Sequence, residues 1–208
     1  MSRQFVSAEW LHLVMLNYEI DPSVLRPLVP GGTQLDAWNG KTFVSLVGFR
    51  FLRTRVLGIP VPFHRNFEEV NLRFYVRRQV GGEWRRGVVF VKEIVPKWAI
   101  AAVARWLYNE SYVACPMDSL IQLPEPSRGL GGIVEYGWGK RPARNVIRAE
   151  FTGSPTCPVA GSQEEFITEH YWGYVLQRRG SSIPGTAPQG LRQAETKSRA
   201  VCLISINS

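Results

Sequence analysis

The chain has 208 residues, of which 45% are hydrophobic, 12% aromatic and 20% charged. This composition supplies enough apolar material for one continuous core and excludes a wholly disordered chain. No apolar run reaches the length of a membrane helix, and the first residues lack the pattern of a secretory signal peptide. We therefore expect one cytoplasmic, strand-rich domain.

The net charge of +8 raises nucleic acid as a partner, because clustered Lys and Arg release counterions from phosphates. Between Arg50 and Lys92, ten basic residues accompany three acidic ones, and many of them alternate with core-type residues along predicted strands. Such alternation favours the solvated face of a sheet over a surface that binds nucleic acid.

The cysteines and histidines indicate no metal site. Cys115, Cys157 and Cys202 form no C-x-x-C spacing, and the three histidines lie far apart in the sequence. The chain also contains no glycine-rich phosphate loop and no G-x-S-x-G motif. We expect reduced thiols, no metal and no cofactor.

The first half of the chain predicts strands, a short helix and two hairpins. Residues 10–20 are apolar at odd and even positions, which favours a strand buried on both sides, and Asp21-Pro22 predicts a short helix that stops at Pro30-Gly31-Gly32. Asn39-Gly40 joins residues 34–38 and 41–47 into a predicted hairpin. Residues 70–77 alternate between a buried and a wet face, and Gly81-Gly82 returns the chain to a strand at 87–95.

The second half predicts two helices and a third hairpin. Pro96 opens a helix to about Asn109, and residues 133–138 and 146–152 form the hairpin. Ser162 and Glu165 form a capping-box pattern that predicts a helix from Glu164 to about His170, followed by a strand at 171–176. Residues 177–208 have the composition of a loose tail, with one further strand predicted near 201–204.

Several stretches of the sequence match a known pattern in the same order. They are WLHL (10–13), LNYE (16–19), WNG (38–40), VSLVGF (44–49), residues 62–76, Ala104-Arg105 with Tyr112, and EF (165–166) leading to HYWGY (170–174). In these stretches the chain resembles the bacterial YqjF-like family, a domain of unknown function (2071) whose fold is similar to that of acetoacetate decarboxylase.

The resemblance implies an α+β, mainly antiparallel fold: a curved barrel or cone with a few short helices and an internal pocket. Residues 1–176 would form this YqjF-like barrel domain, and residues 177–208 would be an atypical, poorly packed tail. Relatives continue into strand-like sequence where this chain becomes rich in Arg, Ser, Gly and Pro. A frameshifted or truncated reading frame is one hypothesis for that difference.

Chemistry of the acetoacetate decarboxylase type would need a lysine that forms a Schiff base with a keto acid. By rough position the resemblance implies Lys97 as that lysine and Glu93 as an acid or base near it. The family of that decarboxylase has a second lysine where Trp98 stands here. The alternative role for Lys97 is a solvated residue at a helix start.

The proline-bounded loop before the strand at 70–77 is the densest group of polar candidates. His64, Arg65, Asn66 and Glu68 could present donors and acceptors to a carboxylate or phosphate ligand. The alternative is structural: an ion pair of Arg65 and Glu68 would fasten the loop to the domain and leave His64 exposed.

Three further residues complete the candidate ligand site: Arg105 on the predicted helix, and His170 and Tyr171 in the aromatic segment. Each also has a structural interpretation, because an arginine among apolar residues can extend its charge to solvent and an aromatic cluster is often core.

The sequence thus predicts a small-molecule-binding barrel for an organic anion, with Arg65 or Arg105 contacting the ligand. One alternative is a lyase that acts on a keto acid through Lys97, and another is a basic nucleic-acid-associated protein. We expect a small organic anion as partner in preference to nucleic acid or a membrane, and a homo-oligomer stays open.

Overall fold

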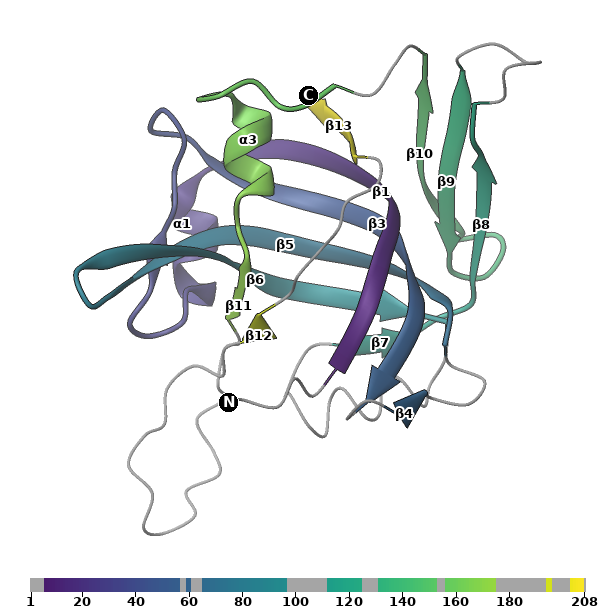
Figure 1. Ribbon diagram of the computed structural model, residues 1–208, viewed down its shortest axis with the longest axis horizontal. Coiled ribbons are helices and arrows are strands. Elements are labelled where there is room, and N and C mark those ends of the chain that lie inside the picture. Colours follow the sequence, from purple (N-terminus) through teal and green to yellow (C-terminus); the bar gives the residue numbers. More distant parts are fainter. Residues whose placement is uncertain are drawn as a thin grey trace, which may run out of the picture.

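The computed structural model describes residues 6–56, 59–60, 65–96, 112–124, 131–152, 156–174, 194–195 and 203–207. Four long strands, β1 (Val6–Ile20), β3 (Thr42–Val56), β5 (Phe67–Val80) and β6 (Glu83–Val95), lie side by side in one strongly curved sheet (Figure 1). All three pairings among them are antiparallel. This part of the chain therefore forms a surface with a concave and a convex face.

Shorter strands extend the sheet to the order β12-β11-β6-β5-β3-β1-β13, while β2 pairs with β5, β4 with β3 and β7 with β6. Their bounds are β2 (Gln34–Leu35), β4 (Ile59–Pro60), β7 (Tyr112–Ala114), β11 (Trp172–Tyr174), β12 (Ala194–Glu195) and β13 (Leu203–Asn207). No sheet formed by the described residues closes on itself, so closure into a barrel stays a prediction.

Bulges help to curve the sheet. The pairing of β1 with β3 shifts register between Ser7 and Glu9 and between Leu11 and Val14. His12 lies in the second shift with a φ of 55°, and Arg53 in β3 also has a φ of 55°. Because a bulge bends its strand and increases the local twist, the ends of β1 and β3 turn away from the plane of the other strands.

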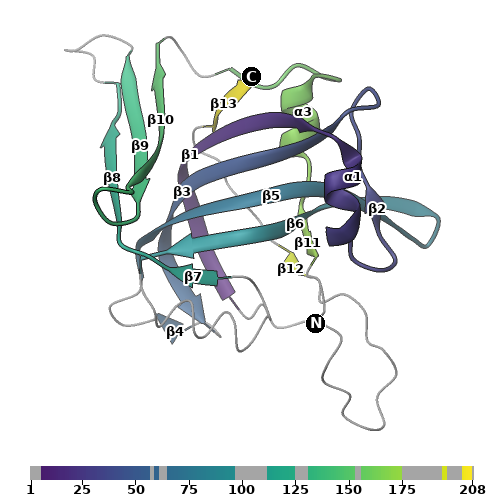
Figure 2. The same cartoon turned by 180° about the vertical axis from the view of Figure 1, so that it is seen from behind.

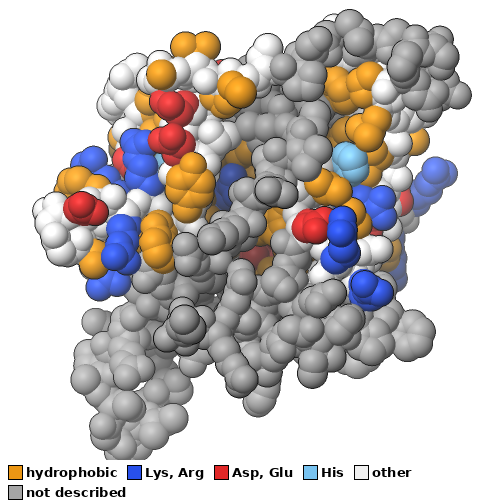
Figure 3. Space-filling model, in the orientation of Figure 1, with side chains coloured by type: hydrophobic (Ala, Val, Ile, Leu, Met, Phe, Trp, Pro, Cys, Tyr) orange, Lys and Arg blue, Asp and Glu red, His pale blue; other side chains and the backbone are white. Residues whose placement is uncertain are grey.

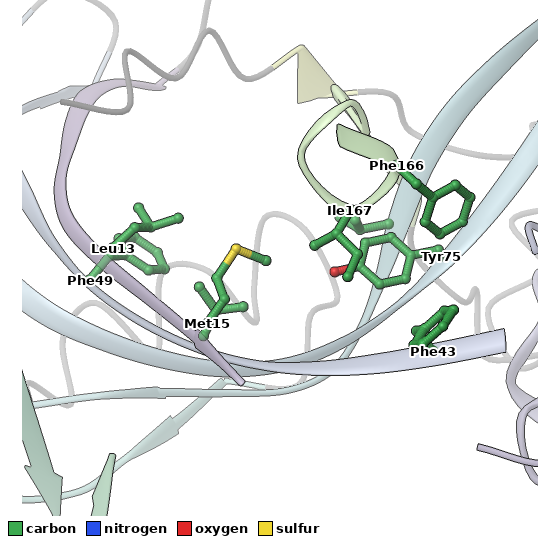
Figure 4. Packing of buried hydrophobic residues seen from close by; sticks show 9 residues of the cluster. Leu13, Met15, Phe43, Phe49, Tyr75, Phe166 and Ile167 are labelled. Carbon is green, nitrogen blue, oxygen red and sulfur yellow. The ribbon is translucent and has the colours of Figure 1, made fainter. Parts of the chain in front are cut away.

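The concave face carries one of the hydrophobic clusters. Leu13, Met15, Phe43, Val47, Phe49, Tyr75 and Val88 project from the strands, and Phe166 and Ile167 project toward them from helix α3 (Gln163–Thr168) (Figure 4). Ser162 caps α3, because its Oγ accepts a hydrogen bond from the backbone N–H of Glu165 at 3.2 Å. Helix α3 thus covers the concave face.

Two elements cover the convex face. A three-stranded antiparallel sheet of β8 (Met117–Gln122), β9 (Gly132–Trp138) and β10 (Asn145–Phe151) packs on Val14 and Val70. The helical turn α1 (Pro22–Leu25), continued by a 3-10 turn η1 (Arg26–Leu28), packs Leu25 against Phe74 and Val76 and is seen from behind in Figure 2. None of the helices in the described residues is long and apolar enough to cross a membrane.

Most of the predicted elements are confirmed. The strand at 10–20, the hairpin of β5 and β6, the hairpin of β9 and β10, and the capped starts of α1 and α3 are present. Helix α3 ends at Thr168, two residues before the predicted end. The predicted helix from Pro96 to Asn109 lies outside the described residues after Pro96, as does most of the predicted tail, in which β12 and β13 are described.

Two of the strand predictions were wrong in part. Asn39 and Gly40 form the expected turn, with φ values of 50° and 78°, but only Trp38 and Lys41 pair across it. Gln34 and Leu35 pair instead with Arg77 and Val76 of β5, beyond the last residues that pair with β3. The predicted wet face of residues 70–77 is largely buried, since α3 from a distant part of the chain covers that side.

Candidate functional site

A buried arginine occupies the middle of the concave face. Side chains alternate between the two faces along β5, and Arg73 lies on the same face as Tyr75 of the concave cluster. Arg73 is 8% exposed, and its Nη2 lies 3.9 Å from Sδ of Met15. Its Nε is buried and donates to no atom in the described part of the chain. Arg73 therefore presents a guanidinium whose donors the described residues leave incompletely satisfied.

A chain of hydrogen bonds runs beside Arg73 on the same face. Oγ of Ser45 in β3 donates to Oδ1 of Asn17 in β1 at 2.6 Å, and the hydroxyls of Ser45 and Tyr75 lie 2.5 Å apart. Ser45 pairs in register with Asn17 on one side and with Arg73 on the other. The strand register thus places an amide, two hydroxyls and a guanidinium in one buried group.

Two carboxylates lie farther along the same face. Glu69 and Glu93 are both buried, and Nδ2 of Asn71 donates to Oε1 of Glu69 at 3.1 Å. Glu93 of β6 pairs in register with Asn71 of β5. This group contains two carboxyl side chains, whereas the group around Arg73 contains a guanidinium, so the two kinds of polar side chain occupy different positions along the concave face.

A histidine and an aspartate form a third polar group at the other end of the concave face. His170 follows α3, Asp36 follows β2, and both side chains are 1% exposed. Nε2 of His170 lies 3.1 Å from Oδ2 of Asp36, and Nε of Arg86 lies 3.1 Å from the same oxygen. The His170 ring also contacts Tyr75, with 4.6 Å between the ring centroids, so this group adjoins the one around Arg73.

The pKa values of both His170 and Asp36 are lowered in the folded protein. Burial lowers the pKa of His170, although the hydrogen bond and negative charge of Asp36 oppose this effect. Burial alone would raise the pKa of Asp36, but the hydrogen bond to His170 and the charges of Arg86 and Arg77 outweigh it and lower that pKa. The resting pair is therefore a carboxylate and a neutral imidazole.

We expect the stability of the protein to fall on acidification because of this pair. Because folding lowers the pKa of His170, this histidine takes up a proton less readily in the folded protein than in the unfolded one. The free energy of unfolding is therefore unaffected above the unfolded pKa of about 6.5, and it decreases as the pH falls from there toward the folded pKa. Urea unfolding at pH 8, 6.5 and 5 should show this loss in the wild type. His170→Gln should show a smaller loss, leaving the contribution of His12, whose pKa burial also lowers. An equal loss in both proteins would contradict the assignment to His170.

The predicted site residues are distributed over different parts of the molecule. Glu93 and His170 are buried at the concave face, whereas Tyr171 is 57% exposed. Glu68 faces β8, where it accepts a hydrogen bond from Oγ of Ser119 at 3.0 Å and lies 3.7 Å from Arg50. His64, Lys97 and Arg105 lie outside the described residues.

Arg65 and Asn66 are exposed and hold their loop to β3. The carbonyl of Arg65 accepts from the N–H of Thr54 at 3.0 Å, and Oδ1 of Asn66 accepts from the N–H of Arg53 at 3.1 Å. The loop is thus fastened to the domain, as the structural alternative predicted. The contacts that fasten it are these two bonds and those of Glu68 with Arg50 and Ser119, whereas the predicted ion pair of Arg65 with Glu68 is not formed.

Sequence reasoning missed five residues of the concave face. They are Asn17, Asp36, Ser45, Arg73 and Tyr75. The alternation of residues 70–77 put Arg73 and Tyr75 on one face, but it carried no signal that a distant helix covers that face. A polar residue within an otherwise apolar strand, such as Asn17 or Ser45, is the signal that could have pointed to a buried polar group.

The fold is that of acetoacetate decarboxylase-like proteins. The chain is similar to acetoacetate decarboxylase of Legionella pneumophila (TM-score 0.54, 12% identity, 82% of this chain and 57% of that one). It is also similar to an acetoacetate decarboxylase-like enzyme of Sphingomonas wittichii RW1 (TM-score 0.56, 15% identity, 93% and 72%). A third similar structure is the enduracididine biosynthesis enzyme MppR complexed with pyruvate (TM-score 0.53, 16% identity, 71% and 58%).

The sequence itself identifies the family. The model of the DUF2071 family, described as an uncharacterized conserved protein, matches residues 7–186, so the chain belongs to this family. The chain is also 38% identical over 68 residues to the uncharacterized protein YqjF of Bacillus subtilis strain 168, and the match covers 32% of this chain and 28% of that protein. The predicted family and its acetoacetate decarboxylase-like fold are thereby confirmed.

Proposed function

We propose that this protein binds a small organic anion on its concave face and that Arg73 recognises the anionic group. The observation that carries the proposal is the buried guanidinium of Arg73, whose Nε donates to no described residue. Arg73 takes no part in the ion pairs formed between described residues. A carboxylate ligand would supply the missing acceptor, because its two oxygens match the planar donors of arginine.

The neighbours of Arg73 suit a small ligand with few polar atoms. The hydroxyls of Ser45 and Tyr75 lie in the same buried group, and Met15, Val47 and Phe166 supply apolar surface. Ligand sites in proteins commonly combine apolar surface with a small number of placed polar groups. A short carboxylate such as a 2-oxo acid fits this chemistry, and MppR is a protein of similar fold that has been observed with pyruvate.

The two alternatives from the sequence make different demands. A Schiff-base lyase needs Lys97, which lies outside the described residues, together with a buried acid such as Glu93. Trapping with borohydride in the presence of keto acids tests this alternative, since the mechanism requires an adduct on Lys97.

The cytoplasmic location expected from the sequence stays a prediction.

A nucleic-acid partner would need the basic end of the sheet. Figure 3 shows Lys and Arg side chains on the side of the molecule where β5 turns into β6. Several arginines of the β5–β6 hairpin already have partners: Arg86 and Arg77 face Asp36, Arg77 lies 4.6 Å from the ring centroid of Trp84, and Arg85 lies 5.0 Å from that of Trp172. These contacts favour a structural role, and a mobility-shift assay at low salt tests the alternative.

Calorimetric titration with a panel of small carboxylates (pyruvate, acetoacetate, lactate and succinate) tests the anion proposal. At least one should bind more tightly than 10 mM, roughly a threshold of 3 kcal/mol in binding free energy, and the neutral analogue pyruvamide should bind far more weakly. Arg73→Met should weaken that binding by about 100-fold, since loss of a buried charge partner costs about 2–5 kcal/mol.

Arg65→Met is the matched control, because Arg65 is exposed and was one of the two arginines, with Arg105, expected from the sequence. This variant should bind the same carboxylate as the wild type does. Absence of binding across the panel, or loss of binding in Arg65→Met with retention in Arg73→Met, would overturn the assignment to the concave face.

A further inference from the structure

His170 presents an unused nitrogen on the concave face. Its Nε2 faces Asp36 at 3.1 Å, and its Nδ1 is buried with no hydrogen-bond partner in the described part of the chain. Since Asp36 is ionised, Nε2 carries the hydrogen and donates it to the carboxylate. Nδ1 is then a bare lone pair, and the geometry of the ring directs it away from Asp36.

A buried acceptor without a hydrogen-bond partner is costly, so its presence calls for a physical explanation. The surroundings hold the ring in this orientation. The ring centroids of Tyr75 and Phe166 lie 4.6 and 4.9 Å from that of His170. Asp36 is itself fixed by Arg86 and by the backbone N–H of Ala37, which donates to Oδ1 at 3.1 Å.

This arrangement is that of a general base oriented by a carboxylate. In the described residues no serine, threonine or cysteine forms a hydrogen bond with Nδ1. The base is therefore not coupled to a nucleophilic side chain there, and its acceptor has no partner among the described residues. Arg73, the buried donor with an unsatisfied Nε, is close enough for its charge to act on His170.

We propose that His170, oriented by Asp36, is a catalytic base that removes a proton from the carbon next to the carbonyl of a 2-oxo carboxylate held by Arg73. This inference rests on the proposed function. In the step, Nδ1 takes the proton, the electrons of the C–H bond form the carbon–carbon double bond, and the carbonyl becomes an enolate. The imidazolium is stabilised by Asp36 and the enolate by the nearby guanidinium. Return of a proton from the imidazolium, after exchange with water, regenerates the oxo acid.

The test is the exchange of the methyl protons of pyruvate in D2O, followed by proton NMR, with pyruvate binding measured on the same samples by calorimetry. The wild type should exchange the methyl protons faster than buffer does. His170→Gln, whose amide can still donate to Asp36, should lose about 100-fold of the enzymatic rate while binding pyruvate within about threefold of the wild type. Asp36→Asn should lose about 10-fold.

The exchange rate should also rise with pH and level off once His170 is neutral. The charged groups that bear on His170 are Asp36, Arg86 and Arg73. A wild type that binds pyruvate without exchanging its methyl protons would overturn this inference and leave anion binding intact. A His170→Gln variant that exchanges them at the wild-type rate would do the same. Absence of pyruvate binding in the wild type would overturn the inference at its first step, whereas the proposed function would fall only with the rest of the carboxylate panel.

Discussion

Gly48→Val should lower the free energy of unfolding by about 3 kcal/mol, because it forces the two sheets apart. A Cβ at Gly48 would lie 2.6 Å from Cδ2 of Tyr136 and 3.2 Å from Cγ2 of Ile147. Tyr136 has no exposed surface, and its hydroxyl donates to the carbonyl of His12 at 2.8 Å, so the ring has little freedom to move. Valine is itself favourable in strands, so a loss would report the packing and not a strand propensity.

Urea unfolding of Gly48→Val and of a matched control, Gly31→Val, measures this effect. A Cβ at Gly31 meets no heavy atom within 4 Å, so the control should stay within about 0.5 kcal/mol of the wild type. A loss below about 1 kcal/mol in Gly48→Val would mean that β9 and β10 adapt their position.

The close approach at Gly48 shows what a sequence leaves open. The strand predicted at 41–47 is the start of the strand that holds Gly48, and the hairpin that supplies Tyr136 and Ile147 was predicted correctly. Periodicity describes which residues share a face of one strand, but it does not say which other strands pack on that face. The need for glycine at this position arises only when both sheets are in place.

Prediction of the candidate site from the sequence is limited in the same way, because its residues come from distant parts of the chain. His170 was predicted as a ligand contact from its aromatic neighbours, but Asp36, its hydrogen-bond partner, lies 134 residues away in sequence. Arg73 was expected on a wet face because arginine alternates there with apolar residues. Its burial depends on α3, which the sequence predicted as an element without predicting where it packs.

Arg73→Met should yield a protein that is at least as stable as the wild type without ligand, with a melting temperature higher by about 2–4 °C, or about 1 kcal/mol. The reason is that a buried cation loses its hydration, and within the described residues Nε gains no hydrogen bond in return. Methionine has a similar length, and the guanidinium that it replaces already contacts Sδ of Met15, so little volume is lost. Differential scanning calorimetry without added anions measures this difference.

The order of the two melting temperatures should reverse when a carboxylate that binds the wild type is present. A ligand at 100 times its dissociation constant stabilises the folded protein by about 2.7 kcal/mol, which exceeds the advantage expected for methionine. The wild type should then melt at the higher temperature, while Arg73→Met, with an affinity about 100-fold lower, should gain only about 0.4 kcal/mol from the same ligand concentration. A melting temperature of Arg73→Met that is lower than that of the wild type by more than about 4 °C, without ligand, would show that Arg73 stabilises the fold itself. If the order of the melting temperatures reverses when the ligand is added, the concave face keeps a destabilising charge because that charge binds the ligand.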